Sequence, residues 1–194
     1  MKIRDLVFIE LFAARKTATT QRAIASSLGC STGTVNHAVR PLAEIGAVKI
    51  SASGLSIQEK GKFLAYWATR RNLACDISYK THCRLAPSRM EASLPPSAIL
   101  TAYGAYRKIY KEVPADYSEV YAYATDPQTL EEIKRRFPPE TGPANLYVLK
   151  ALPQLSGFAV DGVAPAPLVF ADLWNLGTWY AAEYVKAMEA RLVT

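Results

Sequence analysis

The stretch from residue 20 to residue 48 reads TQRAIASSLGCSTGTVNHAVRPLAEIGAV, and it decides the fold of the first part of the chain. Two runs with apolar residues at helical spacing, 21–28 and 32–45, are separated by a short break that begins at Gly29. Glycine adopts a positive φ without steric cost, and Ser31 can accept a hydrogen bond from a free backbone N–H at the start of the second run. The pattern therefore predicts two helices that are joined by a tight turn, with Thr19 or Thr20 as the cap of the first helix.

The second of these helices has one apolar face and one polar face. The apolar face carries Val35, Ala38, Val39 and Leu42, and the polar face carries Gly33, Asn36, His37 and Arg40. A polar stripe that is small and uncharged at its start and basic at its end is typical of a helix that enters the major groove of DNA with its N-terminus first. Asn36 could bind adenine with two hydrogen bonds, and Arg40 could reach guanine or a phosphate. An ordinary solvent-facing stripe is the alternative.

The flanking residues extend the pattern. Residues 3–14 have apolar positions at helical spacing, and Gly46 ends the later helix. Residues 47–51 and 55–58 alternate like strands around a small, polar turn, which predicts a hairpin. Together with these flanking elements, the stretch from Thr20 to Val48 resembles MarR-type and related winged helix-turn-helix regulators. The resemblance implies that residues 1–72 are a DNA-binding domain, although some winged helices bind protein or RNA.

Pro41 lies inside the predicted helix. Proline removes a backbone hydrogen bond and clashes with the preceding turn, at a cost of about 3 kcal/mol in a regular helix. We therefore expect a kink or a break near Arg40 and Pro41.

The charge of the chain is uneven. Residues 1–72 hold eleven Lys and Arg against four Asp and Glu, whereas residues 73–194 hold twelve against thirteen. An excess that is confined to one part suggests a polyanionic partner for that part, with a solvated basic face as the alternative. Phosphate contacts are expected from Arg22, Lys49, Lys60 and Lys62. The predicted DNA-binding residues are Gln21, Arg22, Ser31, Thr32, Gly33, Thr34, Asn36, His37, Arg40, Lys49, Ser53 and Gly54.

The second half, residues 73–194, predicts a separate domain of mixed strands and helices, so the expected fold class of the chain is α+β. Strands are expected at 76–80, 120–124, 146–149 and 158–160. Helices are expected over a short stretch that opens at Ala86, and at 98–111, 126–137, 167–176 and 178–192, with Ser97 as the cap of the second.

Motifs for catalysis are missing from this half. No P-loop, Rossmann fingerprint or nucleophile elbow is present, and His82 is its only histidine. Residues 101–106 and 117–121 resemble the nucleotidyltransferase arrangement, in which a Gly-Ser pair precedes a strand whose two carboxylates hold Mg²⁺. Here no Ser follows Gly104, and tyrosines take the two acidic positions.

The expected domain is therefore a catalytically inactive relative without cofactor or metal. The tyrosines are Tyr121 and Tyr123, and the nearby carboxylates Asp116 and Glu119 have the wrong spacing. The cysteines, Cys30, Cys75 and Cys83, form no CxxC pair and are expected to be reduced thiols.

The C-terminal part carries a second resemblance. Residues 163–174 (VAPAPLVFADLW) and 179–183 (WYAAE) resemble the C-terminal signature of the AbiEi family of type IV antitoxins and their regulator relatives. Those proteins join a winged helix to a nucleotidyltransferase-like domain, and many repress their own operon. Asp172 matches the Asp of the signature and is expected to be a capping or packing carboxylate. Trp174, Trp179 and Tyr180 are expected in the core.

These patterns predict a sequence-specific DNA-binding transcriptional regulator, a repressor that acts as a homodimer on double-stranded DNA. The AbiEi resemblance implies an autoregulating antitoxin with a cognate toxin protein as a possible partner. The alternatives are a nucleotidyltransferase with a nucleic-acid-binding accessory domain and a partner-binding module. No uncharged apolar run approaches the ~18–20 residues that a membrane span needs, and Asp5 and Glu10 interrupt any signal-like start. We expect a cytoplasmic protein with no membrane partner.

Overall fold

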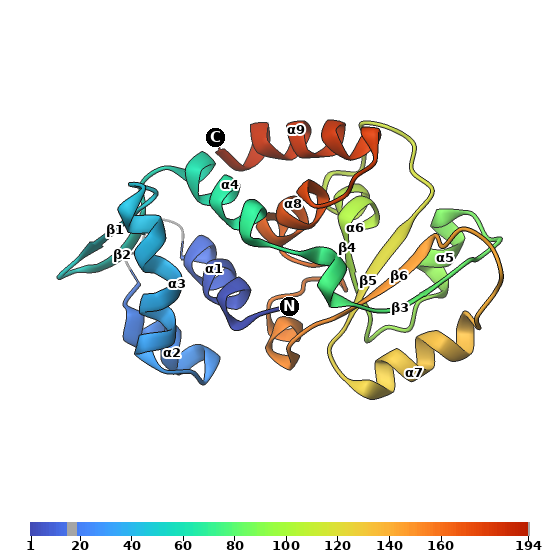
Figure 1. Ribbon diagram of the computed structural model, residues 1–194, viewed down its shortest axis with the longest axis horizontal. Coiled ribbons are helices and arrows are strands. Elements are labelled where there is room, and N and C mark those ends of the chain that lie inside the picture. The colour runs from blue at the N-terminus through green and yellow to red at the C-terminus, as the bar shows by residue number, and fades with distance from the viewer. Residues whose placement is uncertain (15–18, 194) are drawn as a thin grey trace.

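The first part of the chain folds as three helices, a hairpin and a fourth helix. The computed structural model describes residues 1–14 and 19–193. The elements, in order, are α1 (Ile3–Ala13), α2 (Gln21–Leu28), α3 (Thr32–Glu44), β1 (Val48–Ser51), β2 (Gly54–Ile57) and α4 (Lys60–Arg70). Strands β1 and β2 pair antiparallel, and they extend away from the rest of the molecule on the side of α3 (Figure 1). The element types predicted for residues 3–14, 21–28 and 47–58 are confirmed.

Local capping explains why α2 and α3 begin and end where they do. The N–H of Ala23 donates to Thr20 Oγ1 over 3.0 Å, and the N–H of Thr34 donates to Ser31 Oγ over 3.0 Å. Gly29 ends α2 in the left-handed conformation, with φ of 64°. The predicted turn and caps are confirmed, with Thr20 rather than Thr19 as the cap.

Helix α3 runs from Thr32 to Glu44 without a break, so a break near Pro41 is wrong, whereas a kink there stays a prediction. The N–H of Ile45 still donates to the carbonyl oxygen of Pro41 over 3.3 Å. Apolar side chains are buried on both sides of the proline, Val39 before it and Leu42 after it. Burial of a whole apolar face against one core offsets the cost of about 3 kcal/mol that proline brings.

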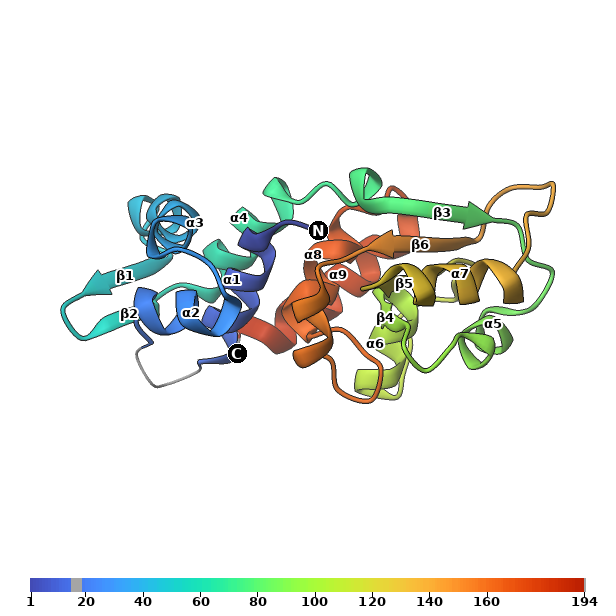
Figure 2. The same cartoon turned by 90° about the horizontal axis from the view of Figure 1, so that it is seen from below.

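The second part of the chain contains a four-stranded mixed sheet with the order β3-β6-β5-β4. Strand β5 is parallel to β6, while β3 and β4 are antiparallel to their neighbours. Helices α6, α8 and α9 lie on one side of the sheet and α7 on the other (Figures 1 and 2). The elements are η1 (Leu73–Asp76), β3 (Ile77–Thr81), α5 (Pro87–Ser93), β4 (Ile99–Thr101), α6 (Ala102–Tyr110), β5 (Val120–Ala124), α7 (Pro127–Arg136), β6 (Leu146–Lys150), η2 (Pro153–Gly157), α8 (Ala166–Trp174) and α9 (Trp179–Val193). The coarse α+β class is confirmed.

Two expectations in this part are wrong. The helix expected over 98–111 with its cap at Ser97 starts only at Ala102, because residues 99–101 form β4 and pair with β5. Sheet pairing of the buried Ile99 and Leu100 overrides the helical pattern. The strand expected at 158–160 is also absent: Val160 makes only an isolated bridge with Val163.

The two parts share one hydrophobic core. The buried apolar side chains form a single cluster that runs through both, and α8 lies against α1 and α4. Phe8 packs edge-on against Phe63 and Trp67, with ring centroids 5.3 Å and 5.6 Å apart. Within the described ranges 1–14 and 19–193, the helices fall short of the length and apolarity that crossing a membrane requires.

Candidate nucleic-acid interface

The exposed face of α3 carries the predicted stripe. Gly33, Asn36, His37 and Arg40 are all exposed, whereas the four apolar residues predicted to face inward are buried. Ser31 and Thr32 are also exposed at the start of the helix, and Thr34 is half-buried. Asn36 and His37 have no polar side-chain partner among the residues that the structure describes. Their hydrogen-bonding groups are therefore available to a ligand.

Unlike Asn36 and His37, Arg40 has a side-chain partner. Its Nε lies 3.1 Å from Oε1 of Glu44 on the next turn, and the two side chains are 74% and 61% exposed. An exposed pair at this spacing contributes only about 0.3–0.5 kcal/mol, so Arg40 can leave it at little cost. The i, i+4 spacing of Arg40 and Glu44 in the sequence is typical of such a pair, although Arg40 was predicted only as a DNA contact.

A surface hollow of about 340 Å³ lies beside the start of α3. It brings together three elements, because residues from the start of α2, the first residue of α3 and the hairpin all line it. The lining residues are Thr20, Gln21, Arg22, Thr32, Ile50, Ser51, Ala52, Gly54 and Leu55. The backbone N–H of Leu55 donates to the carbonyl oxygen of Thr19 over 2.6 Å, which fastens the hairpin next to the start of α2.

The hollow suits an anion. The first N–H groups of a helix have no partner within the helix, and its N-terminus carries a partial positive charge. Here the N-terminus of α2 adjoins the exposed side chain of Arg22. A phosphate oxygen could accept hydrogen bonds from both.

The hairpin supplies small polar groups at its tip. Lys49 and Ser53 are exposed, as the prediction requires, and Ser53 Oγ lies 2.8 Å from Ser51 Oγ. Gly54 is buried with φ of 123°, and its carbonyl oxygen accepts a hydrogen bond from Ser51. Gly54 therefore shapes the tip rather than presenting a surface of its own. Sequence reasoning missed Ile50, which is 44% exposed beside the hollow.

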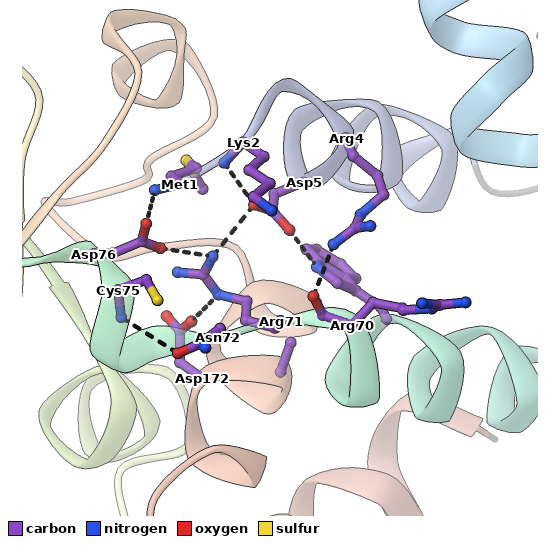
Figure 3. Close-up of polar contacts among 12 residues, drawn as sticks. Met1, Lys2, Arg4, Asp5, Arg70, Arg71, Asn72, Cys75, Asp76 and Asp172 are labelled. Carbon is purple, nitrogen blue, oxygen red and sulfur yellow. Dashed lines mark hydrogen bonds and ion pairs between the residues drawn. The ribbon is translucent and has the colours of Figure 1, made fainter.

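The basic excess of the first part is only partly on the surface. Arg22, Arg40, Lys49, Lys60 and Lys62 are exposed. The side chain of Arg71, in contrast, is only 2% exposed and pairs with three carboxylates (Figure 3). Its distances are 2.6 Å to Asp172, 2.9 Å to Asp76 and 3.2 Å to Asp5. Arg15 and Lys16, which also enter the count, lie outside the described residues.

Asp172 is the centre of this buried network, so the expectation of a packing carboxylate is confirmed. Besides Arg71, it accepts hydrogen bonds from Thr101 Oγ1 over 2.6 Å and from the hydroxyl of Tyr123 over 2.5 Å. Burial raises the pKa of Asp172 and Arg71 opposes that shift, while burial raises the pKa of Tyr123 well above its usual range. Through Arg71, which directly follows α4, the network joins α1, η1, α8, β4 and β5.

The two positions at which the sequence resemblance would expect paired carboxylates are tyrosines of β5. Tyr121 and Tyr123 are buried on β5, and the ring of Tyr121 stacks on Tyr147 of the neighbouring strand, 4.7 Å away. Asp116 is exposed, and half-buried Glu119 accepts a hydrogen bond from Tyr180. Across residues 1–14 and 19–193, no three His, Cys, Asp or Glu side chains gather as a metal site would require.

The two C-terminal tryptophans were expected in the core, and this is wrong. Trp174 is 43% exposed and Trp179 is 78% exposed, while Tyr180 is half-buried. Both tryptophans flank the turn between α8 and α9, where they fall outside the faces that pack inward. The core positions of α9 are Ala181, Tyr184 and Met188 instead.

Comparisons with models of protein families, with curated proteins and with solved structures found no match to this chain.

Proposed function

We propose that the protein is a sequence-specific DNA-binding transcriptional regulator, a repressor, whose residues 1–72 form a winged helix-turn-helix. The observation that carries the proposal is the exposed polar face of α3 beside a hollow that the start of α2 and the hairpin share. In this reading, α3 enters the major groove, α2 and Arg22 hold a backbone phosphate, and the hairpin contacts the flanking DNA. Repression follows from occupation of a promoter.

In the same proposal, residues 73–194 are a catalytically inactive nucleotidyltransferase-like domain. The order β4, α6, β5 supports it, with Gly104 in the helix that precedes the central strand. So do the buried Tyr121 and Tyr123, which cannot hold Mg²⁺ as paired carboxylates would. The proposed biological setting is cytoplasmic, as a homodimer and as the autoregulating antitoxin of a type IV system with a cognate toxin.

Titration of the protein with DNA from upstream of its own gene and with random DNA of equal length tests the proposal. The wild type should prefer the upstream DNA. Replacement of Asn36 or Arg40 by Ala should cost about 1–3 kcal/mol on the preferred site and little on random DNA. Arg22→Ala should weaken both and lower the salt dependence by about one counterion.

The matched control is Arg135→Ala on α7, an arginine whose side chain is 77% exposed and far along the chain from α3. It should leave both affinities unchanged. Equal affinity of the wild type for the two DNAs would reject sequence-specific recognition. Unchanged affinity in both the Asn36 and the Arg40 variants would reject α3 as the reading element.

A further inference from the structure

We propose that the exposed face of α9 is a two-fold interface on which a second copy of the chain docks with its own α9 antiparallel. This interface would hold together the homodimer of the proposed function, on which the inference rests. The interface itself could form whether or not the protein binds DNA.

The face is defined by spacing along the helix. Ala181, Tyr184 and Met188 of α9 are buried against the core. The opposite side carries exposed residues about one turn apart along the whole helix, which places them in one stripe. That stripe consists of Trp179, Ala182, Glu183, Lys186, Glu189 and Val193. Helix α9 lies along the outer edge of the molecule, so this face is turned away from the rest of the chain (Figure 1).

Large apolar side chains occupy both ends of the stripe. Trp179 is 78% exposed at its start and Val193 is 42% exposed at its end. Tryptophan is the residue type most enriched among those that dominate the binding energy of protein interfaces. An exposed indole at the first position of a surface helix therefore points to a partner surface.

The charges at the middle of the stripe select a second copy as that partner. Neither Glu183 nor Lys186 forms an ion pair within the part of the chain that the structure describes. If a two-fold axis passes between Tyr184 and Val185, Glu183 lies opposite the partner's Lys186, and Lys186 lies opposite the partner's Glu183. An axis through Lys186 would instead set like charges against each other. An axis between Ala187 and Met188 would pair Lys186 with the partner's Glu189, but it would leave Trp179 beyond the end of the partner helix. Electrostatic complementarity and the length of α9 together favour the first register.

The apolar ends fit the same register. Trp179 then lies opposite the last turn of the partner helix. Side chains on a helix lean toward its N-terminus, so the indole leans toward the partner's Val193. Both ends of the interface receive this contact, because the two-fold axis repeats it.

The interface between the two helices is small, so we expect the dimer to be weak. A helix of 15 residues is about 22 Å long, so a pair of such helices buries an area at the low end of specific interfaces. We expect a dimer with a dissociation constant in the micromolar range. Two copies of α3 on a two-fold symmetric DNA site would add a second contribution to assembly.

Charge swaps test the interface, with sedimentation velocity over a concentration series as the measurement. Glu183→Lys and Lys186→Glu should each weaken the dimer by about tenfold or more, because each sets like charges face to face. The double variant Glu183→Lys, Lys186→Glu should restore it. An equimolar mixture of the two single variants should form a mixed dimer. Trp179→Ala should weaken self-association without any change of charge.

Lys134→Glu on α7 is the matched control, since it makes the same change of charge as Lys186→Glu away from α9. It should leave self-association unchanged. A wild type that stays monomeric at high concentration would overturn the proposal, and so would a double variant that stays dissociated. Unaltered self-association in both single variants would also overturn it.

Binding to a single half-site separates this inference from the DNA-binding proposal. Because α3 is untouched, the α9 variants should bind one half-site as the wild type does and lose affinity only for the two-fold site. If the swaps behave as expected while no DNA binds, the proposed function fails alone. If DNA binds and the swaps have no effect, the α9 interface fails alone.

Discussion

At the scale of single residues, the buried network around Arg71 is the feature that sequence reasoning could not find. Arg70 and Arg71 are adjacent and look like the basic end of one helix. Only Arg71 turns inward, to meet Asp5, 66 positions earlier, and Asp172, 101 positions later. No local pattern encodes such a meeting, because the fold alone brings the partners together. The resemblance that singled out Asp172 gave a position but not its partner.

Replacement of Asp172 tests the energetic role of this network. Asp172→Asn keeps the size of the side chain but removes the charge closest to buried Arg71. Removal of one partner from a buried ion pair costs about 3–5 kcal/mol of unfolding free energy. We expect a loss near the lower limit, because Asp5 and Asp76 still face the guanidinium. Urea denaturation measures it.

The control for this variant is Glu131→Gln, which removes an exposed charge from the i, i+3 pair with Lys134. Its effect should stay within about 0.5 kcal/mol. A loss of the same small size in Asp172→Asn would show that the network contributes little to folding.

At the scale of elements, sequence patterns predict those parts whose causes are local. The caps at Thr20 and Ser31, the turn at Gly29 and the hairpin follow from neighbouring residues, and they agree with the structure. Strand β4 could not be predicted from neighbouring residues, because its partner β5 begins 19 positions after β4 ends. The polar stripe of α3 could likewise be predicted, whereas the hollow beside it depends on how the hairpin meets α2.

Pro41→Ala tests how α3 tolerates its proline. Alanine restores a backbone N–H that can donate to the carbonyl oxygen of His37 and removes the clash with the preceding turn. We expect the unfolding free energy to rise by about 1–2 kcal/mol, less than the full cost of proline in a helix because some contacts of the half-buried ring are lost. Chemical denaturation with an unchanged m-value is the measurement. A fall in stability would mean that the ring itself holds α3 in place.

At the scale of the whole molecule, one core connects the parts that the sequence divides at residue 72. Arg71 lies at that boundary and contacts α1, η1 and α8, so whether residues 1–72 and 73–194 are separate domains stays a prediction. Composition could not indicate the shared core, because apolar residues are frequent in both parts. The uneven charge of the sequence is more informative, since most of the described basic residues of the first part are exposed.

The tyrosines of the second part predict loss of stability at alkaline pH. Burial raises the pKa of nine of them above the usual value of about 10, among them Tyr103, Tyr121 and Tyr184. The folded state therefore holds protons that the unfolded state releases near pH 10. The stability that these groups contribute is complete below about pH 10 and is lost as the pH rises toward their folded-state pKa values.

Thermal unfolding between about pH 8 and pH 12 measures this effect. The melting temperature should fall steeply above about pH 10, together with the appearance of tyrosinate absorbance. A melting temperature that stays level across this range would contradict the burial of the tyrosine hydroxyls.

The central claim is that α3, the start of α2 and the hairpin together contact DNA, and amide NMR shifts on titration with DNA from upstream of the gene test it most directly. We expect perturbations to concentrate at residues 20–22, 31–40 and 49–54 and to spare α7, although α7 carries the basic run Lys134, Arg135 and Arg136. Perturbations centred on α7, with α3 unaffected, would contradict the account.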